Sequence, residues 1–523
     1  MNRTFVAMLS AIGGCFVITP LIALEHSVGK NGINARRLQE APYHLLGRKI
    51  AIGQVEIGRV GQFGWDKVAS ENYPLDVAGV FKRDRAANPN EYVDPHAIMV
   101  ATVMVSQQKG LKGVAPEAQL YSTAVGSLRQ AGQPKQCLAL QHTAFQNGGD
   151  VRAINLSYGD SLEADSRDNP KLDGQALLTK CVDWSARVHN VLYVVAGNQG
   201  KGGIPLPTDQ YNGITAAYSF RDQDTYNKVG FPNLSGEPRG IGRRLIEQEI
   251  NTEGRSGVSL VAPGSAISVH HPEQDTVEVT GTSFAAPHVT GVVALLQEYS
   301  DRVLEDSPAE TPPWSLDARR QEVMKAVLLN SADKISGDQK RTLRGKQNQT
   351  WLQSNAYKNP DKPLDLQLGA GHLNADRAYQ QFSAGQWQPE TVVPSMGWDY
   401  NQVIANSHQD YRLETPLKAG SYATVTLTWN RFVELEDENQ NEQFDRGEKL
   451  RDRGLNNLDL FLIPEGETFS QAHHCASTSN VDSVEHIFCK VPETGKYKIR
   501  VQFSDQTHQP TQRYGLAWWT TSE

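Results

Sequence analysis

The apolar positions of the chain are densest between Thr280 and Leu296, which read TGTSFAAPHVTGVVALL. Small residues open this stretch, and the apolar run that follows starts at Pro287 and carries no charge before Glu298. Proline is tolerated in a first helical turn, and Ala, Val and Leu suit a helix packed in a core. The pattern therefore predicts a tight turn feeding a buried helix, with Ser283 at the mouth of that helix.

The predicted place of Ser283 suits a hydroxyl nucleophile. The first N–H groups of a helix have no partner within the helix, and the helix dipole is positive at that end. Negative charge that develops on a reacting oxygen is stabilised there. An ordinary buried helix with a small-residue entry is the alternative interpretation.

Short apolar runs upstream of Ser283 predict the strands of a mostly parallel sheet. The run NVLYVV within 190–200 has no polar face, which is typical of a strand buried on both sides. Such strands present functional residues at their carboxyl ends, next to the loops that follow. Candidate functional residues follow three such strands. They are Glu56 after 50–55; Ser157, Tyr158 and Gly159 after 153–156; and Ala196, Gly197 and Asn198 after 190–195.

A second apolar helix is predicted from His96 to Ser106, and it is followed by the turn sequence GVAP at 113–116 and another strand. A single histidine is more often structural than catalytic. The function of His96 therefore depends on what surrounds it.

The chain changes character after about Trp387. Runs such as YATVTLTW at 422–429 alternate apolar and polar residues and are bounded by Gly, Pro or Asn, without a helical pattern. Similar runs lie at 458–463, 485–491 and 497–503. We expect a small antiparallel β-sandwich here.

The composition fits a globular chain with a large core. Of 523 residues, 39% are hydrophobic and 21% charged, mean hydropathy is −0.49, and this length suits two or three domains. The formal net charge is −8, and no stripe of Lys and Arg is evident, so a nucleic-acid partner is not expected.

Residues 1–24 have the pattern of an export signal, with one Arg near the start and no further charge before Glu25. A cut near Ala23 would leave residues 25–47 as a short N-terminal extension, which could itself be a pro-peptide. A retained membrane anchor and lipidation at Cys15 are the alternatives. On the first interpretation the protein is secreted or periplasmic.

Export also bears on the cysteines. If Cys15 leaves with the signal, an even number remains for an oxidising compartment. The local pairing joins Cys137 to Cys181 and Cys475 to Cys489. Free buried thiols are the alternative.

Together these segments resemble the subtilisin-like serine peptidases. The stretch 281–291 matches the nucleophile motif GTSxAAPHVxG of that family, and GVAP at 113–116, VAPG at 261–264 and GAGHLNA at 369–375 match further segments in the family's order. The resemblance covers about residues 48–382. It implies a peptidase domain at 48–383 and a C-terminal β-sandwich domain at 384–523.

The resemblance also implies roles for residues of the site. Ser283 matches the nucleophile, His96 the general base, and Asn198 the donor to the oxyanion. The segments Ser157, Tyr158, Gly159 and Ala196, Gly197 match those that bind substrate. Such enzymes cleave protein or peptide substrates and need no cofactor for catalysis.

Two departures from the family pattern stand out. Glu56 occupies the position where the family has the Asp that orients the histidine, and it is one methylene longer, so we expect the strand or loop to sit further back. The helix after His96 has Ala97, Ile98, Met99 and Thr102 where the family has Gly, Thr, His and Gly. A catalytically silent binding module is therefore the alternative function, while an esterase lacks its G-x-S-x-G elbow.

An acidic segment inside the β-rich part has the ligand spacing of a calcium loop. The candidate ligands of a structural Ca²⁺ are Asp437, Asn439, Asn441, Gln443 through its carbonyl, Asp445 and Glu448. The sixth position, normally Gly, is Glu442. A solvated hairpin loop without metal is the alternative.

Overall fold

The structure is a computed structural model, and it describes residues 24–56, 75, 77–86, 95–126, 128–197, 205–222, 225–230, 251–306, 314–335, 342–466 and 475–520. The predicted signal before Leu24, the loop after Glu56 and Asn198 lie outside the described residues. Within the described part of the chain, no helix is long and apolar enough to span a membrane.

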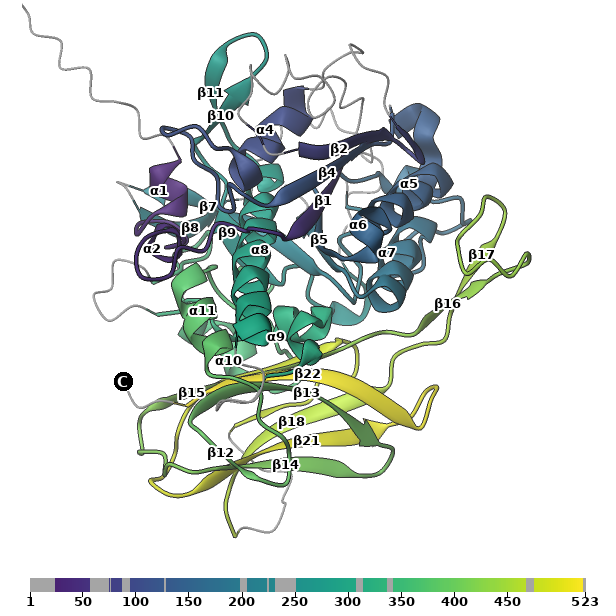
Figure 1. The fold of residues 1–523 in the computed structure, drawn as a ribbon. Coiled ribbons are helices and arrows are strands. Elements are labelled where there is room, and N and C mark those ends of the chain that lie inside the picture. Colours follow the sequence, from purple (N-terminus) through teal and green to yellow (C-terminus); the bar gives the residue numbers. More distant parts are fainter. Residues whose placement is uncertain are drawn as a thin grey trace, which may run out of the picture.

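A mostly parallel sheet forms the centre of the α/β part, which confirms the predicted fold class (Figure 1). Its strand order is β3-β2-β4-β1-β5-β6-β7-β8, with β9 beside β7, and only β3 and β8 run antiparallel to their neighbours. The strands are β1 (Ala51–Glu56), β2 (Val77–Lys82), β3 (Arg85–Ala86), β4 (Gln119–Ala124), β5 (Val151–Leu156), β6 (Leu192–Ala196), β7 (Ile214–Asp222), β8 (Thr225–Gly230) and β9 (Leu260–Pro263).

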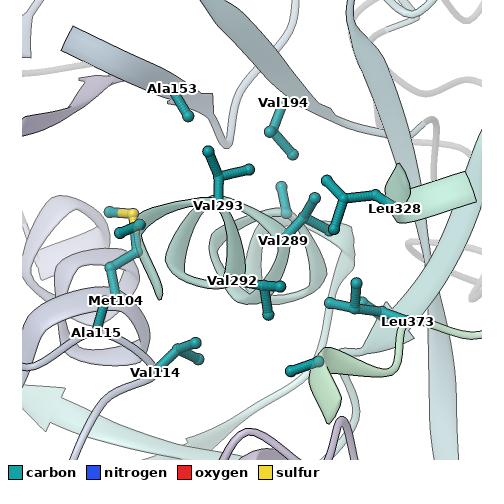
Figure 2. Packing of buried hydrophobic residues seen from close by; sticks show 14 of the residues in the cluster. Met104, Val114, Ala115, Ala153, Val194, Val289, Val292, Val293, Leu328 and Leu373 are labelled. Atoms are coloured by element: carbon teal, nitrogen blue, oxygen red, sulfur yellow. The ribbon is translucent and has the colours of Figure 1, made fainter. Parts of the chain in front are cut away.

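Helices cover both faces of this sheet. One face carries α4 (Pro95–Val105) and α8 (Thr282–Asp306), and the other carries α5 (Leu128–Ala144) and α7 (Leu177–His189). Strand β6 shows why its sequence is apolar throughout: Val194 belongs to the core on the α8 face, and Val195 to the core on the α5–α7 face. Figure 2 shows Val289, Val292 and Val293 of α8 within the first of these cores.

The N-terminal segment is packed into the same core. It contains two short helices, α1 (Glu25–Val28) and α2 (Arg36–Gln39), and Leu24, Val28 and Leu38 are fully buried. Removal of this segment would expose the apolar surface that it covers.

Two sheets make up the sandwich at the C-terminal end, and their strand pairs are antiparallel except for β12 beside β14. One has the order β12-β14-β21-β18-β19 and the other β13-β22-β15-β20, and their inner faces share one core. The strands are β12 (Val392–Val393), β13 (Met396–Ile404), β14 (His408–Leu413), β15 (Tyr422–Trp429), β18 (Asn457–Pro464), β19 (Ala476–Ser477), β20 (Val484–Lys490), β21 (Tyr497–Asp505) and β22 (Thr511–Trp519). The four predicted runs form β15, β18, β20 and β21.

Helix α9 (Gln321–Asn330) joins the two parts by packing on β22 and β15 (Figure 1). The contact is close, because a Cβ at Gly515 would lie 2.6 Å from the backbone carbonyl of Glu322. A 3-10 turn (Leu316–Arg319) precedes α9. Helix α11 (Ala375–Ser383) packs beside α9, α8 and β13.

A hairpin of the β-rich part reaches back along the α/β part (Figure 1). We call residues 431–453, which contain β16 (Val433–Glu436) and β17 (Lys449–Asp452), the arm. Phe444 at its tip is 1% exposed and packs in the core that contains α5 and α7. The Gln141 side chain of α5 accepts from the N–H of Phe444 at 2.6 Å, so the tip is held by apolar and polar contacts.

Candidate active site

Glu56 and His96 meet where β1 ends and α4 begins. Glu56 is the last residue of the central strand β1 and is fully buried, while His96 is the second residue of α4. His96 Nδ1 lies 2.8 Å from Glu56 Oε2, and the imidazole is 28% exposed. A buried carboxylate thus contacts one ring nitrogen and can hold its proton there. The other nitrogen, Nε2, is then the one that can act as a base.

Ser283 is the second residue of α8, and its loop is tied to two strand ends. The Ser283 hydroxyl donates to the backbone oxygen of Ser157 at 3.1 Å, just after β5. The Thr282 hydroxyl donates to the backbone oxygen of Gly197 at 2.7 Å, just after β6. The nucleophile candidate is therefore fixed at the carboxyl edge of the sheet, as predicted for this fold.

Helix α8 begins at Thr282, five residues before Pro287, so Ser283 lies in its first turn. Proline has no N–H to bond the carbonyl four residues earlier, and that carbonyl belongs to Ser283. The Ser157 hydroxyl donates to it instead, at 2.7 Å. The carbonyl of Ser283 therefore has a donor in spite of the proline, and the residue directly after β5 supplies it.

The next residue along α8 brings the serine and histidine segments together. The Phe284 ring lies 6.0 Å from the His96 ring, centroid to centroid, and the phenylalanine is 5% exposed. The α8 entry and the α4 entry are thus packed side by side. The apolar wall also shields one side of the imidazole from water.

The predicted substrate-binding segments lie beside Ser283. Ser157 and Tyr158 are nearly fully buried, and the pKa of Tyr158 is raised by burial. Asp160, next to Gly159, pairs its backbone with Leu206 at 2.8 and 3.0 Å. Ala196 ends β6, and Gly197 donates its N–H to Ala216. The predicted oxyanion donor Asn198 follows directly, outside the described residues.

One supporting residue, Asn155, was not singled out from the sequence. Its side-chain amide donates to the Ser157 hydroxyl at 2.8 Å, which in turn donates to Ser283 O. Position 155 is fully buried in β5. An amide between the apolar residues Ile154 and Leu156 was the available signal, because a buried polar group needs a partner.

The structure joins the cysteines in the pairs expected from their local spacing. Cys137 of α5 is bonded to Cys181 of α7, and Cys475 to Cys489 of β20, with Cα–Cα separations of 5.7 and 5.6 Å. The first disulfide lies in the core that also contains Phe444 of the arm.

The candidate calcium residues line the tip of the arm. Asp437 accepts from the N–H groups of Gln440 and Glu442, both at 2.7 Å, and the amides of Asn439 and Asn441 converge on Asp445 at 2.7 and 2.9 Å. Glu448 folds back to accept from the N–H groups of Glu438 and Asp445. Among the described residues, no group of three or more His, Cys, Asp or Glu is arranged to hold a metal ion.

Glu442 adopts the backbone conformation that a calcium loop needs at its sixth position. Its φ is 59°, in the left-handed region that usually favours Gly. The loop therefore makes its sharp turn without glycine.

Comparisons with known proteins agree with the motifs. The profile described as the Subtilase family matches residues 61–371, a range that includes His96 and Ser283 and begins after Glu56. Thermitase of Thermoactinomyces vulgaris is 25% identical over 52% of this chain and 74% of its own length. M-protease of Shouchella clausii is 29% identical over 39% of this chain and 42% of its own length. The solved structure of the prenylagaramide maturation protease PagA aligns with 66% of this chain and 97% of its own, at 20% identity and a TM-score of 0.41.

Proposed function

The chain belongs to the Subtilase family, and from this premise we propose that it is an exported serine endopeptidase that cleaves peptide bonds through an acyl-enzyme on Ser283. The observation that carries the proposal is the 2.8 Å contact between Glu56 and His96 beside the entry of α8. A silent binding module would not need a buried carboxylate paired with a partly exposed imidazole.

The chemistry follows from the roles of these groups. The Ser283 hydroxyl turns from Ser157 O towards His96 and attacks the carbonyl carbon of the scissile bond, while Nε2 takes its proton. Glu56 holds Nδ1–H and stabilises the imidazolium. His96 then gives the proton to the leaving amine, and water hydrolyses the ester in a second, equivalent cycle.

Charge on the tetrahedral oxygen needs donors at the same edge. The backbone N–H of Ser283, in the first turn of α8, is one of them by position. Asn198 is the second donor in our proposal, supported by its place directly after Gly197, which the Thr282 hydroxyl contacts. Ser157, Tyr158, Gly159, Ala196 and Gly197 are proposed to flank the bound peptide.

The arm is proposed to hold one structural Ca²⁺, and no cofactor takes part in the reaction. The donor set is chemically suitable, because carboxylate, amide and carbonyl oxygens are the ligands that calcium prefers. The left-handed turn at Glu442 supports this assignment. The amides of Asn439 and Asn441, whose N–H groups donate to Asp445, would turn their oxygens to the ion.

Export, the domain division and the substrate complete the proposal. A signal at 1–24, an extension at 25–47, a peptidase domain at 48–383 and a sandwich domain at 384–523 fit the buried disulfides and the two separate sheet systems. The protein would act on proteins or peptides outside the cytoplasm.

A fluorophosphonate probe tests the central assignment. The probe should label the wild-type chain, and Ser283→Ala should abolish both labelling and peptide hydrolysis. Ser300→Ala is the matched control, since this buried serine lies on the same helix and its hydroxyl has no hydrogen-bond partner among the described residues. Labelling of Ser283→Ala at the wild-type rate would place the nucleophile elsewhere.

A further inference from the structure

A polar cavity of about 480 Å³ lies where the α/β part meets the sandwich. Its walls come from the end of α7, the start of α9, the strands β13 and β22, and the loop before β22. Asn190, in the wall, precedes β6, whereas Gly197, which contacts the nucleophile loop, follows it. The cavity is therefore at the opposite edge of the sheet from Ser283.

The lining of this cavity is strongly cationic. It includes the three arginines Arg187, Arg320 and Arg513, against one carboxylate, Glu322. No ion pair joins any of the three arginines to a carboxylate in the part of the chain that the structure describes, whereas the buried Arg152 is paired. Unpaired charges gathered in one cavity are unfavourable unless something else neutralises them.

The one carboxylate is too little to balance three guanidinium groups. Glu322 is buried, and its Oε1 accepts at 2.6 Å from the amide of Asn430, which also lines the cavity. Burial raises the pKa of Glu322, although the charges of Arg320 and Arg513 oppose that shift. It is therefore a weak counter-charge for three guanidinium groups.

Two of the guanidinium groups lie over aromatic rings. Arg187 lies over Phe432 at 4.5 Å, and Arg320 over Tyr400 at 5.0 Å, measured from Cζ to the ring centroid. Arg187 also donates to Val433 O at 2.7 Å, but its Nε is buried without a hydrogen-bond partner among the described residues. A guanidinium group that rests on a ring keeps its N–H groups available for bidentate contacts to carboxylate or phosphate oxygens.

His508 adds a neutral donor to the same wall. Its Nδ1 accepts from the N–H of Gln509 at 2.7 Å, so the ring proton is on Nε2 in the neutral form. That Nε2 is buried and has no hydrogen-bond partner among the residues described. Arg187 Nε and His508 Nε2 are thus two buried donors in one cavity that await an acceptor.

We propose that this cavity binds a small oxyanion with more than one negative charge, of the phosphate or polycarboxylate class. Arg187 and Arg320 of the α/β part and Arg513 and His508 of the sandwich would contact it from both sides. The bound anion would neutralise the arginines and join the two parts. It therefore stabilises their contact, at a place remote from the peptidase chemistry.

Calorimetric titration of the full chain measures this binding directly. Inorganic phosphate and citrate are titrated in separate arms at constant ionic strength. The chain is first dialysed into calcium-free buffer without chelator, because a chelator is itself a polycarboxylate and would compete for the site. We expect saturable binding of at least one of them, and a higher melting temperature in its presence. Absence of saturable binding in both arms would overturn the proposal.

Variants then locate the site. Arg513→Gln should weaken binding at least tenfold, and Arg320→Gln should do the same from the other wall. Arg412→Gln, an exposed arginine on β14 outside the cavity, is the matched control and should bind as wild type does. Arg513 is itself exposed, so its replacement leaves the fold intact, which circular dichroism checks. Undiminished binding by both cavity variants would place the anion elsewhere and contradict the proposal.

Discussion

At the scale of single residues, the pair of Glu56 and His96 decides whether this chain can be an enzyme. The carboxylate is fully buried, and the imidazole is partly exposed and 2.8 Å away. Glu56→Gln keeps the shape of the side chain but offers an amide N–H to Nδ1, which favours the tautomer with the proton on Nε2. The base that Ser283 needs is then lost, and we expect kcat to fall by roughly 10⁴, as for an analogous change in another serine protease.

The companion change at this position is Glu56→Asp. It restores the usual residue of the family but shortens the reach to Nδ1 by one methylene at the end of β1, so we expect activity between those of wild type and Glu56→Gln. Steady-state kinetics on one peptide substrate compare all three. Near-full activity of Glu56→Gln would show that another acid orients the histidine.

Ser157 offers a second residue-scale prediction. Its hydroxyl is the donor that replaces the missing N–H of Pro287 at Ser283 O, at 2.7 Å. Ser157→Ala leaves that carbonyl without its donor, which costs about 1–3 kcal/mol of unfolding free energy, and loosens the nucleophile. Because small misplacements at a reacting centre are costly, kcat should fall by roughly tenfold to a hundredfold.

The matched control for Ser157→Ala is Ser300→Ala, which removes an unpartnered hydroxyl from the same helix. Urea unfolding and kinetics of both variants separate the two effects. Equal stability and equal kcat of the two variants would mean that the hydrogen bond from Ser157 to Ser283 O does not hold the nucleophile in place.

These residues also show what sequence can and cannot predict. Motif and order placed Ser283, His96 and Glu56, and strand ends predicted that they would lie at one edge of the sheet. The bond from Ser157 to Ser283 O was not predictable, because the two residues are 126 positions apart and the partner is a backbone atom. The pattern of side chains in the sequence does not show which backbone carbonyl lacks a hydrogen-bond donor.

At the scale of elements, periodicity predicted the longest apolar strands and both buried helices of the site. It did not identify α5 or α7, which pack on the opposite face of the sheet, nor β13, β14 and β22 of the sandwich. The strand β13 (MGWDYNQVI) mixes Asp, Asn and Gln with its apolar residues. Asp399 there is buried and accepts from the Tyr411 hydroxyl at 2.8 Å, so a tertiary contact accounts for a residue that strands usually avoid.

The arm carries the element-scale prediction. If Ca²⁺ binds to its tip, chelator should lower the melting temperature and added Ca²⁺ should restore it, because the metal stabilises the native loop that holds Phe444 in the core of α5 and α7. The response should disappear in the double variant Asp437→Ala, Glu448→Ala. The measurement uses a Ser283→Ala background so that autolysis does not interfere.

The control for the arm removes the same charge from the surface of the sandwich. Glu414 and Glu493 are both exposed, and the double variant Glu414→Ala, Glu493→Ala should respond to chelator as the parent does. A full chelator response that persists in the arm variant would place the metal elsewhere. Glu442→Gly adds a readout, since relief of the left-handed φ of 59° should strengthen binding.

At the scale of the whole molecule, the sequence predicted two parts but not how they meet. The contact is built from polar and aromatic residues scattered along the chain, and no local pattern marks them. The buried Arg431 of the arm shows this: it pairs with Asp183 of α7 at 3.2 Å and stacks on Tyr211 at 4.7 Å. A reader of the sequence alone would have placed such an arginine on the surface.

Lys334 lies in the same contact and makes stability depend on pH. It is buried after the end of α9, with its ammonium 5.5 Å from the ring centroid of Trp351 and 5.0 Å from that of Phe488 in the sandwich. Burial first, and then the charge of Arg377, lower its pKa from 10.5 to about 7, while Asp333 opposes the shift. The folded chain therefore releases this proton at a lower pH than the unfolded chain does.

The sign of the effect follows from proton counting. Between pH 7 and 10.5 the unfolded chain binds a proton at Lys334 that the folded chain does not, so the free energy of unfolding rises with pH across that window. One proton corresponds to about 1.4 kcal/mol per pH unit in the middle of the window.

Lys334→Met keeps an apolar chain between the rings but does not titrate. The free energy of unfolding of this variant should rise less steeply with pH, by about that slope. The variant should exceed the parent in stability most near pH 7, as urea unfolding in the Ser283→Ala background would measure. Lys490→Met, at an exposed lysine of β20, should keep the parent slope. An unchanged slope in Lys334→Met would mean that Lys334 stays protonated in the folded protein, and that the two rings and Asp333 stabilise its ammonium group.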